Sequence, residues 1–260
     1  MESELPVELI HRIQSCMSEK NAGGTCILSK SWLHAWYTIP HLRFHKDRLI
    51  DNTLERYHRL NLPIQTLDIW FEVRKHDTAP LTRWIRQVAS TSCLKELSLS
   101  FDIIRDSFTL PDSIFSGKNL TGINVINEAH NCSDNIEHRR HGMFSSNNNM
   151  INCVSLRVLV LHQVNISEES KFIFLEELNV EFVYRTLNIT SFVIASNTLK
   201  RLTLYANSNM PNDIQVDALA LFYFYYESYN IPTTLSFPVV APKHIELKIN
   251  LATVDAGRGS

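Results

Sequence analysis

Glycine, cysteine and long apolar runs are all scarce in this sequence of 260 residues. Only seven glycines occur, and none of them cluster after a predicted strand, as a phosphate-binding loop requires. The five cysteines are an odd number without C-x-x-C spacing, which excludes a disulfide framework and a zinc ribbon and predicts buried free thiols. The longest strongly apolar run, Ala218–Tyr226, is far shorter than the roughly 20 residues of a membrane span.

Strong net charge and an apolar leader are missing as well. The formal net charge is -2, so no basic field attracts nucleic acid to the chain. The N-terminus reads Met1-Glu2-Ser3-Glu4, which is neither basic nor apolar as a secretory signal would be. We therefore expect a soluble intracellular protein that binds neither nucleic acid nor a membrane.

No catalytic arrangement is visible. The motifs G-x-S-x-G and H-E-x-x-H and the phosphate loop are absent. Cys132, His138 and His141 share one polar stretch, but a fourth metal ligand is missing and the spacing fits no zinc site. We interpret that stretch as a solvated loop and expect no enzyme activity, no metal and no cofactor.

The N-terminal residues carry the pattern of an amphipathic helix. Pro6 suits the first turn, where its missing N–H is not needed, and Glu8 complements the positive end of the helix dipole. We therefore predict a helix over residues 5–17. Its apolar face consists of Leu9, Ile10, Ile13, Cys16 and Met17.

Two shorter helices are predicted next. Residues 21–28 form the second, which Gly23-Gly24 weaken by roughly 1 kcal/mol per glycine relative to alanine. Ser29 can cap the third, which holds Trp32 and Trp36 one turn apart. The two tryptophans are either core residues of this unit or anchors for a partner.

Helical spacing appears twice more, first before the repeats described below and then in a return segment between two of them. The apolar residues of these two patterns are Leu49, Ile50, Leu54, Tyr57 and Leu60, and then Leu81, Trp84, Ile85 and Val88.

A pattern L-x-x-L-x-L, with Ile or Val substituting, recurs through the rest of the chain. Its copies are Ile64-Leu67-Ile69, Leu94-Leu97-Leu99, Leu120-Ile123-Val125, Leu156-Leu159-Leu161, Leu175-Leu178-Val180 and Leu199-Leu202-Leu204, with Val216-Leu219-Leu221 weaker and Ile245-Leu247-Ile249 keeping only the alternation. Leucine-rich repeats have a period of roughly 20–29 residues, each with a short strand and a return segment. A polar stretch near 130–150 explains the longest gap as a loop insertion.

Strand alternation also predicts the exposed residues of the sheet. If the repeat leucines point inward, the residues between them point outward and form the face that such repeats use for binding. The candidates for binding a substrate on this face are Trp70, Glu96, His162, Glu177, Arg201 and Tyr205.

The N-terminal unit resembles an F-box, in the form found in the plant F-box/leucine-rich-repeat family. The matching residues are Leu5-Pro6-x-Glu8 and Leu28-Ser29-Lys30-x-Trp32 with Trp36. Further on, Trp84-Ile85 and Leu110-Pro111-x-Ser113-Ile114-Phe115 are similar to conserved segments of the same family. The resemblance extends over about residues 4–205.

This resemblance implies an α/β fold in which a short three-helix F-box, residues 1–45, precedes an irregular leucine-rich-repeat solenoid with a parallel sheet, residues 46–251. We expect residues 252–260 to be a flexible tail. The implied function is that of the substrate-recognition subunit of a Skp–cullin–F-box ubiquitin ligase in the nucleus or cytoplasm. The residues implied to bind the Skp-type adaptor are Leu5, Pro6, Leu9, Ile10, Ile13, Met17, Leu28, Ser29, Trp32 and Trp36.

Several residues depart from the family pattern, and each change removes apolar area or helix propensity. These residues are Gln14, Cys16, Ser18, Gly23, Gly24 and Ser31. One alternative is therefore a leucine-rich-repeat interaction module that works without a ligase and keeps a degraded F-box. A small enzyme and a secreted receptor are weaker alternatives, because no catalytic motif and no signal peptide are visible.

Overall fold

The computed structural model describes residues 5–45, 50–72, 79–89, 93–102, 119–127, 155–162, 174–182, 191–206, 212–229, 231–237 and 241–250. The predicted insertion near 130–150, the predicted tail at 252–260 and the cluster of Cys132, His138 and His141 lie outside these residues.

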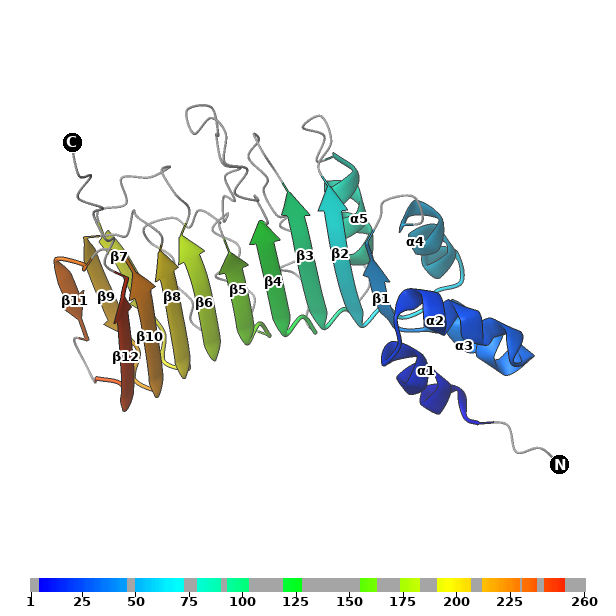
Figure 1. Ribbon diagram of the computed structural model, residues 1–260, viewed down its shortest axis with the longest axis horizontal. Coiled ribbons are helices and arrows are strands. Elements are labelled where there is room, and N and C mark those ends of the chain that lie inside the picture. The colour runs from blue at the N-terminus through cyan, green and yellow to red at the C-terminus, as the bar shows by residue number, and fades with distance from the viewer. Residues whose placement is uncertain are drawn as a thin grey trace, which may run out of the picture.

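The helices gather at the N-terminal end of the molecule (Figure 1). They are α1 (Val7–Ser15), α2 (Glu19–Gly24), α3 (Lys30–Thr38), α4 (Ile50–Arg59) and α5 (Ala79–Ala89), with a 3-10 turn η1 (Thr25–Ile27) after α2. No helix in the described part of the chain is both long enough and apolar enough to span a membrane.

A nine-stranded parallel sheet forms the body of the molecule (Figure 1). In spatial order its strands are β1 (His41–Phe44), β2 (Thr66–Glu72), β3 (Glu96–Asp102), β4 (Gly122–Asn127), β5 (Val158–His162), β6 (Glu177–Phe182), β8 (Arg201–Ala206), β10 (Tyr223–Ser228) and β12 (His244–Ile249). The fold class is thus α/β with a parallel sheet, as predicted, and it is consistent with a leucine-rich-repeat arrangement.

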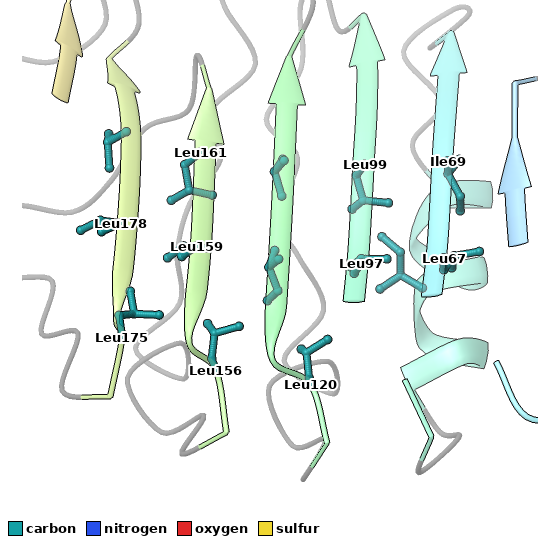
Figure 2. Close-up of a cluster of buried hydrophobic side chains, with 14 of the residues drawn as sticks. Leu67, Ile69, Leu97, Leu99, Leu120, Leu156, Leu159, Leu161, Leu175 and Leu178 are labelled. Carbon is teal, nitrogen blue, oxygen red and sulfur yellow. The ribbon is translucent and has the colours of Figure 1, made fainter. Parts of the chain in front are cut away.

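The repeated apolar residues form the core of this sheet. Every member of the six predicted copies from Ile64 to Leu204 is at most 5% exposed. Figure 2 shows part of this set, from Leu67 to Leu178, in rows along one face of neighbouring strands. Burying each one contributes roughly 1.5–3 kcal/mol, so the repetition of the pattern is what holds the strands in one register.

Helices α4 and α5 cover the core face of the first strands. Leu54 and Tyr57 of α4 and Trp84 of α5 are at most 2% exposed and belong to the same core as the strand leucines. The spacing in the sequence predicted both helices. Leu60 was wrongly included in the first, because α4 ends before it and Leu60 is 53% exposed.

A second, three-stranded parallel sheet closes the core at the other end of the molecule. Its strands are β7 (Ser191–Ala195), β9 (Asp213–Asp217) and β11 (Thr234–Ser236), in the order β11-β9-β7. In sequence they alternate with β6, β8, β10 and β12 of the large sheet, so the return segments here are strands rather than helices. The repeat pattern did not predict this sheet.

A ladder of turn hydrogen bonds marks each repeat and shows where one prediction was wrong. The carbonyl of Lys95 accepts from the N–H groups of Thr121 and Gly122, and the carbonyl of Lys200 likewise accepts from Phe222 and Tyr223. The seventh copy is therefore Leu221-Phe224-Tyr226, which is buried. The predicted copy Val216-Leu219-Leu221 is wrong, because Val216 lies in β9 of the second sheet and Leu219 is 56% exposed.

The last strand differs from the others. The alternation Ile245-Leu247-Ile249 does form a strand, β12, which pairs with β10. Ile245 and Leu247 are nevertheless 47% and 55% exposed, because no described element packs over them.

Candidate functional site

One side of helix α1 carries an exposed apolar stripe. Leu5, Leu9, Ile13 and Met17 follow one another at intervals of four residues: Leu9 and Ile13 lie one turn apart in α1, Leu5 precedes the helix and Met17 follows it. Each of them is 37–46% exposed, and Pro6 at the start of the helix is exposed as well. A continuous apolar stripe of this kind on a small unit is typical of a surface that a partner covers.

The turn between α2 and α3 extends this apolar surface. Leu28 is 62% exposed and Ile27 is 90% exposed. Ser29 is the N-cap of α3, where its hydroxyl accepts the N–H of Trp32 at 3.4 Å, as predicted. Because α3 begins only after Ser29, Ile27 and Leu28 are not part of this helix. Ile27 was not among the predicted residues, although its apolar character beside Leu28 was visible in the sequence.

The inner side of α1 holds residues that no partner can reach without rearrangement. Ile10 is 1% exposed and Gln14 is 1% exposed. The Nε2 of Gln14 donates to the Oγ1 of Thr25 at 3.0 Å and to the carbonyl of Trp32 at 3.2 Å. Gln14 is thus the polar link between α1, η1 and α3, whereas its Oε1 is buried without a partner in the described residues.

Trp32 and Trp36 are both partly buried, so part of each indole packs inside the protein and part is exposed to solvent. The indole of Trp36 lies against Gly23 of α2, at 3.6 Å from where a Cβ would be. Ser18, another departure from the family pattern, caps α2 by accepting the N–H of Asn21 at 3.4 Å. Ser18 therefore adds helix stability where a loss was expected, whereas a Cβ at Gly23 would meet the indole only at an ordinary van der Waals distance.

The thiols of the described cysteines, Cys16, Cys26 and Cys93, are free. The expectation that they are buried is wrong: Cys16, just after the end of α1, is exposed, and Cys26 and Cys93 are only partly buried. No group of three or more His, Cys, Asp or Glu side chains that could hold a metal ion lies among the residues that the structure describes.

The predicted substrate-binding residues lie on the open face of the sheet, which we define as the side opposite the buried leucines. The strand register divides them into two rows. Trp70, His162 and Tyr205 share the row nearer the carboxyl ends of the strands. Strands lie about 4.8 Å apart, so Trp70 and Tyr205 are separated by roughly 24 Å. The three aromatic side chains are therefore spread along the face and do not form one site.

The charged candidates occupy the other row. Glu96 of β3, Glu177 of β6 and Arg201 of β8 are aligned through the register, and Glu177 lies directly opposite Arg201. Opposite charges in adjacent positions of a sheet attract each other by a fraction of a kcal/mol at an exposed site.

On the open face, a group of side chains that contact one another lies on the last strands, β8, β10 and β12. This is the region where the predicted seventh repeat was wrong. The ring centroids of Tyr205 and Tyr225 are 5.4 Å apart. Tyr225 donates its hydroxyl to Glu227 at 2.7 Å, and Lys248 pairs with the same carboxylate at 2.7 Å. The side chain of Asn250 donates to it as well, at 2.9 Å. We name Tyr205, Tyr225, Glu227 and Lys248 the tyrosine–glutamate cluster.

Hydrogen bonds set the protonation of this cluster. Those from Lys248, Tyr225 and Asn250 lower the pKa of Glu227 to about 2, so it stays ionised. The hydrogen bond to Glu227 raises the pKa of Tyr225, so the phenol stays neutral and keeps donating. Aromatic rings held around a fixed carboxylate form a rigid surface that can contact a partner at small entropic cost.

The middle of the open face is polar. The Nδ1 of His162 lies 3.3 Å from the carboxylate of Glu181, which fixes the ring toward β6. The side-chain oxygens of Asn124 and Asn179, on either side of β5, are buried without a partner among the described residues. Val160 lies between Asn124 and Asn179 in the register, so this row of the open face has one apolar side chain between two polar ones.

The chain is similar in sequence to curated proteins of Arabidopsis thaliana. It is 28% identical over 223 residues to F-box/FBD/LRR-repeat protein At2g04230, a match that covers 78% of this chain and 46% of that protein. It is 24% identical over 275 residues to F-box/LRR-repeat protein At5g38396, covering 96% of this chain and 57% of that protein. A stretch of 60 residues is 42% identical to F-box/LRR-repeat protein 25, covering 21% of this chain and 23% of that protein.

These matches, at low identity but over much of the chain, support the resemblance drawn from the sequence motifs. The chain spans about half the length of the first two of these relatives. No family model matches the chain, and no solved structure matches it.

Proposed function

We propose that this chain, a plant F-box/leucine-rich-repeat protein, is the substrate-recognition subunit of a Skp–cullin–F-box ubiquitin ligase. In this proposal α1, α2 and α3 are the three-helix F-box, and the two parallel sheets with α4 and α5 are the leucine-rich-repeat solenoid. The chain performs no bond chemistry itself and works in the nucleus or cytoplasm. It joins a Skp-type adaptor, and through it a cullin, to a protein substrate.

The observation that carries the proposal is the exposed apolar surface of the N-terminal helices. Leu5, Leu9, Ile13 and Met17 along α1 and Leu28 before α3 remain in water although they are large and apolar. About half of each side chain is already buried, so a partner that covered the rest would contribute roughly 0.5–2 kcal/mol for each one. Their positions are those that the F-box motif of the sequence assigns to the adaptor.

In this proposal the buried residues of the N-terminal helices have a different role from the exposed ones. Ile10 and Gln14 hold α1 against η1 and α3, so they act on the adaptor through the position of the helix rather than by touching it. The caps at Ser18 and Ser29 stabilise helices that depart from the family pattern. A degraded F-box that lost its adaptor would have no need to keep the outer stripe apolar.

For the substrate, the proposal uses the open face of the sheet. Its tyrosine–glutamate cluster combines two aromatic rings with a carboxylate and a lysine, the side-chain types that anchor protein partners. Trp70 and His162 lie in the same row of the open face as Tyr205, on strands closer to the F-box. A protein segment lying along this row would contact aromatic groups at several points.

Binding to a purified Skp-type adaptor tests the proposal. Isothermal titration of the intact protein is expected to detect a complex, and Leu9→Ala and Leu28→Ala are each expected to weaken it by about tenfold, since truncating an interface anchor costs roughly 1–2 kcal/mol. Leu247→Ala is the matched control, because this leucine is 55% exposed on β12 at the other end of the sheet. It should leave the affinity unchanged.

The same measurement distinguishes the ligase proposal from the ligase-independent interaction module. If the folded wild-type protein does not bind while a control F-box protein does, the ligase proposal fails and the ligase-independent interaction module replaces it. Equal losses for Leu28→Ala and Leu247→Ala would show that the assigned surface is wrong. Circular dichroism of each variant confirms that its fold is intact.

A further inference from the structure

A cavity of about 600 Å³ lies between the N-terminal helices and the first part of the sheet. Its walls come from α1, α2, α3, β1, α4 and β2, which meet at this end of the molecule (Figure 1). The volume falls within the roughly 300–1,000 Å³ of pockets that hold small organic ligands. Neither the adaptor surface nor the tyrosine–glutamate cluster accounts for it.

One part of the cavity wall is apolar. Ala22 of α2 and Trp36 of α3 line it, together with Met17 just after α1, Ile39 just after α3 and Leu42 of β1. Trp36 is only partly buried, so part of its indole is available to a ligand. An apolar wall with an aromatic ring suits the body of a small organic molecule.

The polar part of the wall is positively charged. Arg56 of α4 stacks against the rings of Tyr37 and Tyr57, with 4.9 and 5.4 Å between its guanidinium carbon and the ring centroids. This stacking holds the guanidinium in one place and leaves its edge for hydrogen bonds. The Nε of Arg56 is buried and has no hydrogen-bond partner in the described part of the chain.

No described carboxylate neutralises Arg56. The one acidic side chain in the wall, Asp68, is already paired with Arg43 at 3.2 Å. Burial raises the pKa of Tyr57 to about 12, so this phenol stays neutral, and it donates its hydrogen to the carbonyl of Ile39 at 2.6 Å. Lys20 adds a second positive charge to the wall. Arg56 is partly buried and its buried Nε has no partner among the described residues, so an anionic ligand would supply the missing hydrogen bond and a counter-charge.

We propose that this cavity binds a small organic anion, with its carboxylate, sulfonate or phosphate group at Arg56 and its apolar or aromatic body against Trp36 and Met17. This inference goes beyond the ligase function and does not depend on it. Met17 and Trp36 are also among the predicted adaptor-binding residues, so the ligand and the adaptor would share two side chains. Binding of either could therefore alter the affinity for the other.

Two fluorescent probes of the same shape test the proposal. 8-Anilinonaphthalene-1-sulfonate carries the anionic group, and N-phenyl-1-naphthylamine is the same ring system without it. Arg56→Gln is expected to weaken the sulfonate probe by about tenfold and to change the affinity of the neutral probe little, since it removes a charged hydrogen-bond partner and keeps the cavity. Arg86→Gln is the matched control, an exposed arginine of α5 that does not line the cavity, and should affect neither probe.

A second variant keeps the test decisive if Arg56→Gln does not fold. Thr53 of α4 also lines the cavity and is only partly buried, so Thr53→Phe narrows the space with little strain. It is expected to weaken both probes several-fold. If folded Arg56→Gln binds the sulfonate as the wild type does, or if Thr53→Phe leaves both affinities unchanged, the probes bind elsewhere and the proposal is wrong.

Discussion

Gln14 offers a sharp test of how the N-terminal helices are held together. It stands where the plant F-box pattern has leucine, and it is 1% exposed. Its Nε2 makes two hydrogen bonds, to Thr25 and to the carbonyl of Trp32, while its Oε1 has no partner in the described residues. We predict that Gln14→Leu changes the free energy of unfolding by less than about 1 kcal/mol.

The magnitude follows from the opposing contributions. Losing two hydrogen bonds costs about 2 kcal/mol, at about 1 kcal/mol each. Removing the unpaired buried oxygen returns about 1–3 kcal/mol. The groups left behind keep partners, because Thr25 donates its hydroxyl to the carbonyl of Ala22 at 2.6 Å and Trp32 lies within α3. The terms therefore nearly cancel.

Gln14→Ala is the matched variant, since it removes the same amide but leaves a cavity. It is expected to be less stable than Gln14→Leu by about 2–4 kcal/mol, the usual difference between leucine and alanine at a buried site. Urea unfolding followed by tryptophan fluorescence and by circular dichroism measures both differences, and coincident curves confirm a two-state transition. If Gln14→Leu is destabilised as much as Gln14→Ala, the hydrogen bonds of the amide are essential and the reasoning is refuted.

Two further predictions concern α2 and the tyrosine–glutamate cluster. Gly24→Ala is expected to stabilise the protein by about 0.5–1 kcal/mol in the same urea assay, because Gly24 has helical backbone angles and a Cβ there would meet nothing within 4 Å. A loss of stability would contradict the α2 geometry. Glu227, whose pKa is lowered to about 2, contributes stability above its ordinary pKa of about 4.5 that is lost as the pH falls toward 2. The stability difference between wild type and Glu227→Gln should therefore shrink over this range, and Lys248→Met should show a weaker pH dependence; a constant difference would rule out the cluster.

The repeat pattern predicted the body of the sheet well, because a strand buried on one side alternates apolar and polar residues. Leu159 and Leu161 are buried and their neighbour Val158 is 36% exposed, as the alternation requires. The pattern failed where aromatic residues replace leucine. Phe224 and Tyr226 occupy the inner positions of β10, and a search for leucine selected Val216 and Leu219 instead.

The second sheet could not be read from the sequence for a different reason. Its strand β7 buries Phe192 and Ile194, an alternation too short to distinguish from a loop or a helix. Of the tyrosine–glutamate cluster only Tyr205 was predicted, because the cluster depends on the register that joins β8, β10 and β12. The cavity at Arg56 was missed because its walls come from six elements, and residues distant in sequence meet there only once the chain has folded.

Hydrogen–deuterium exchange of the intact protein, with and without a saturating Skp-type adaptor, tests the central proposal most directly. The account predicts added protection in α1 and at the junction of η1 and α3, where Leu9, Ile13 and Leu28 are exposed. It predicts no change in β5, β6 and β8, which leaves the open face of the sheet to the substrate. Exchange that is unaltered in the N-terminal helices, or protection confined to the strands, would contradict the assignment of the F-box surface.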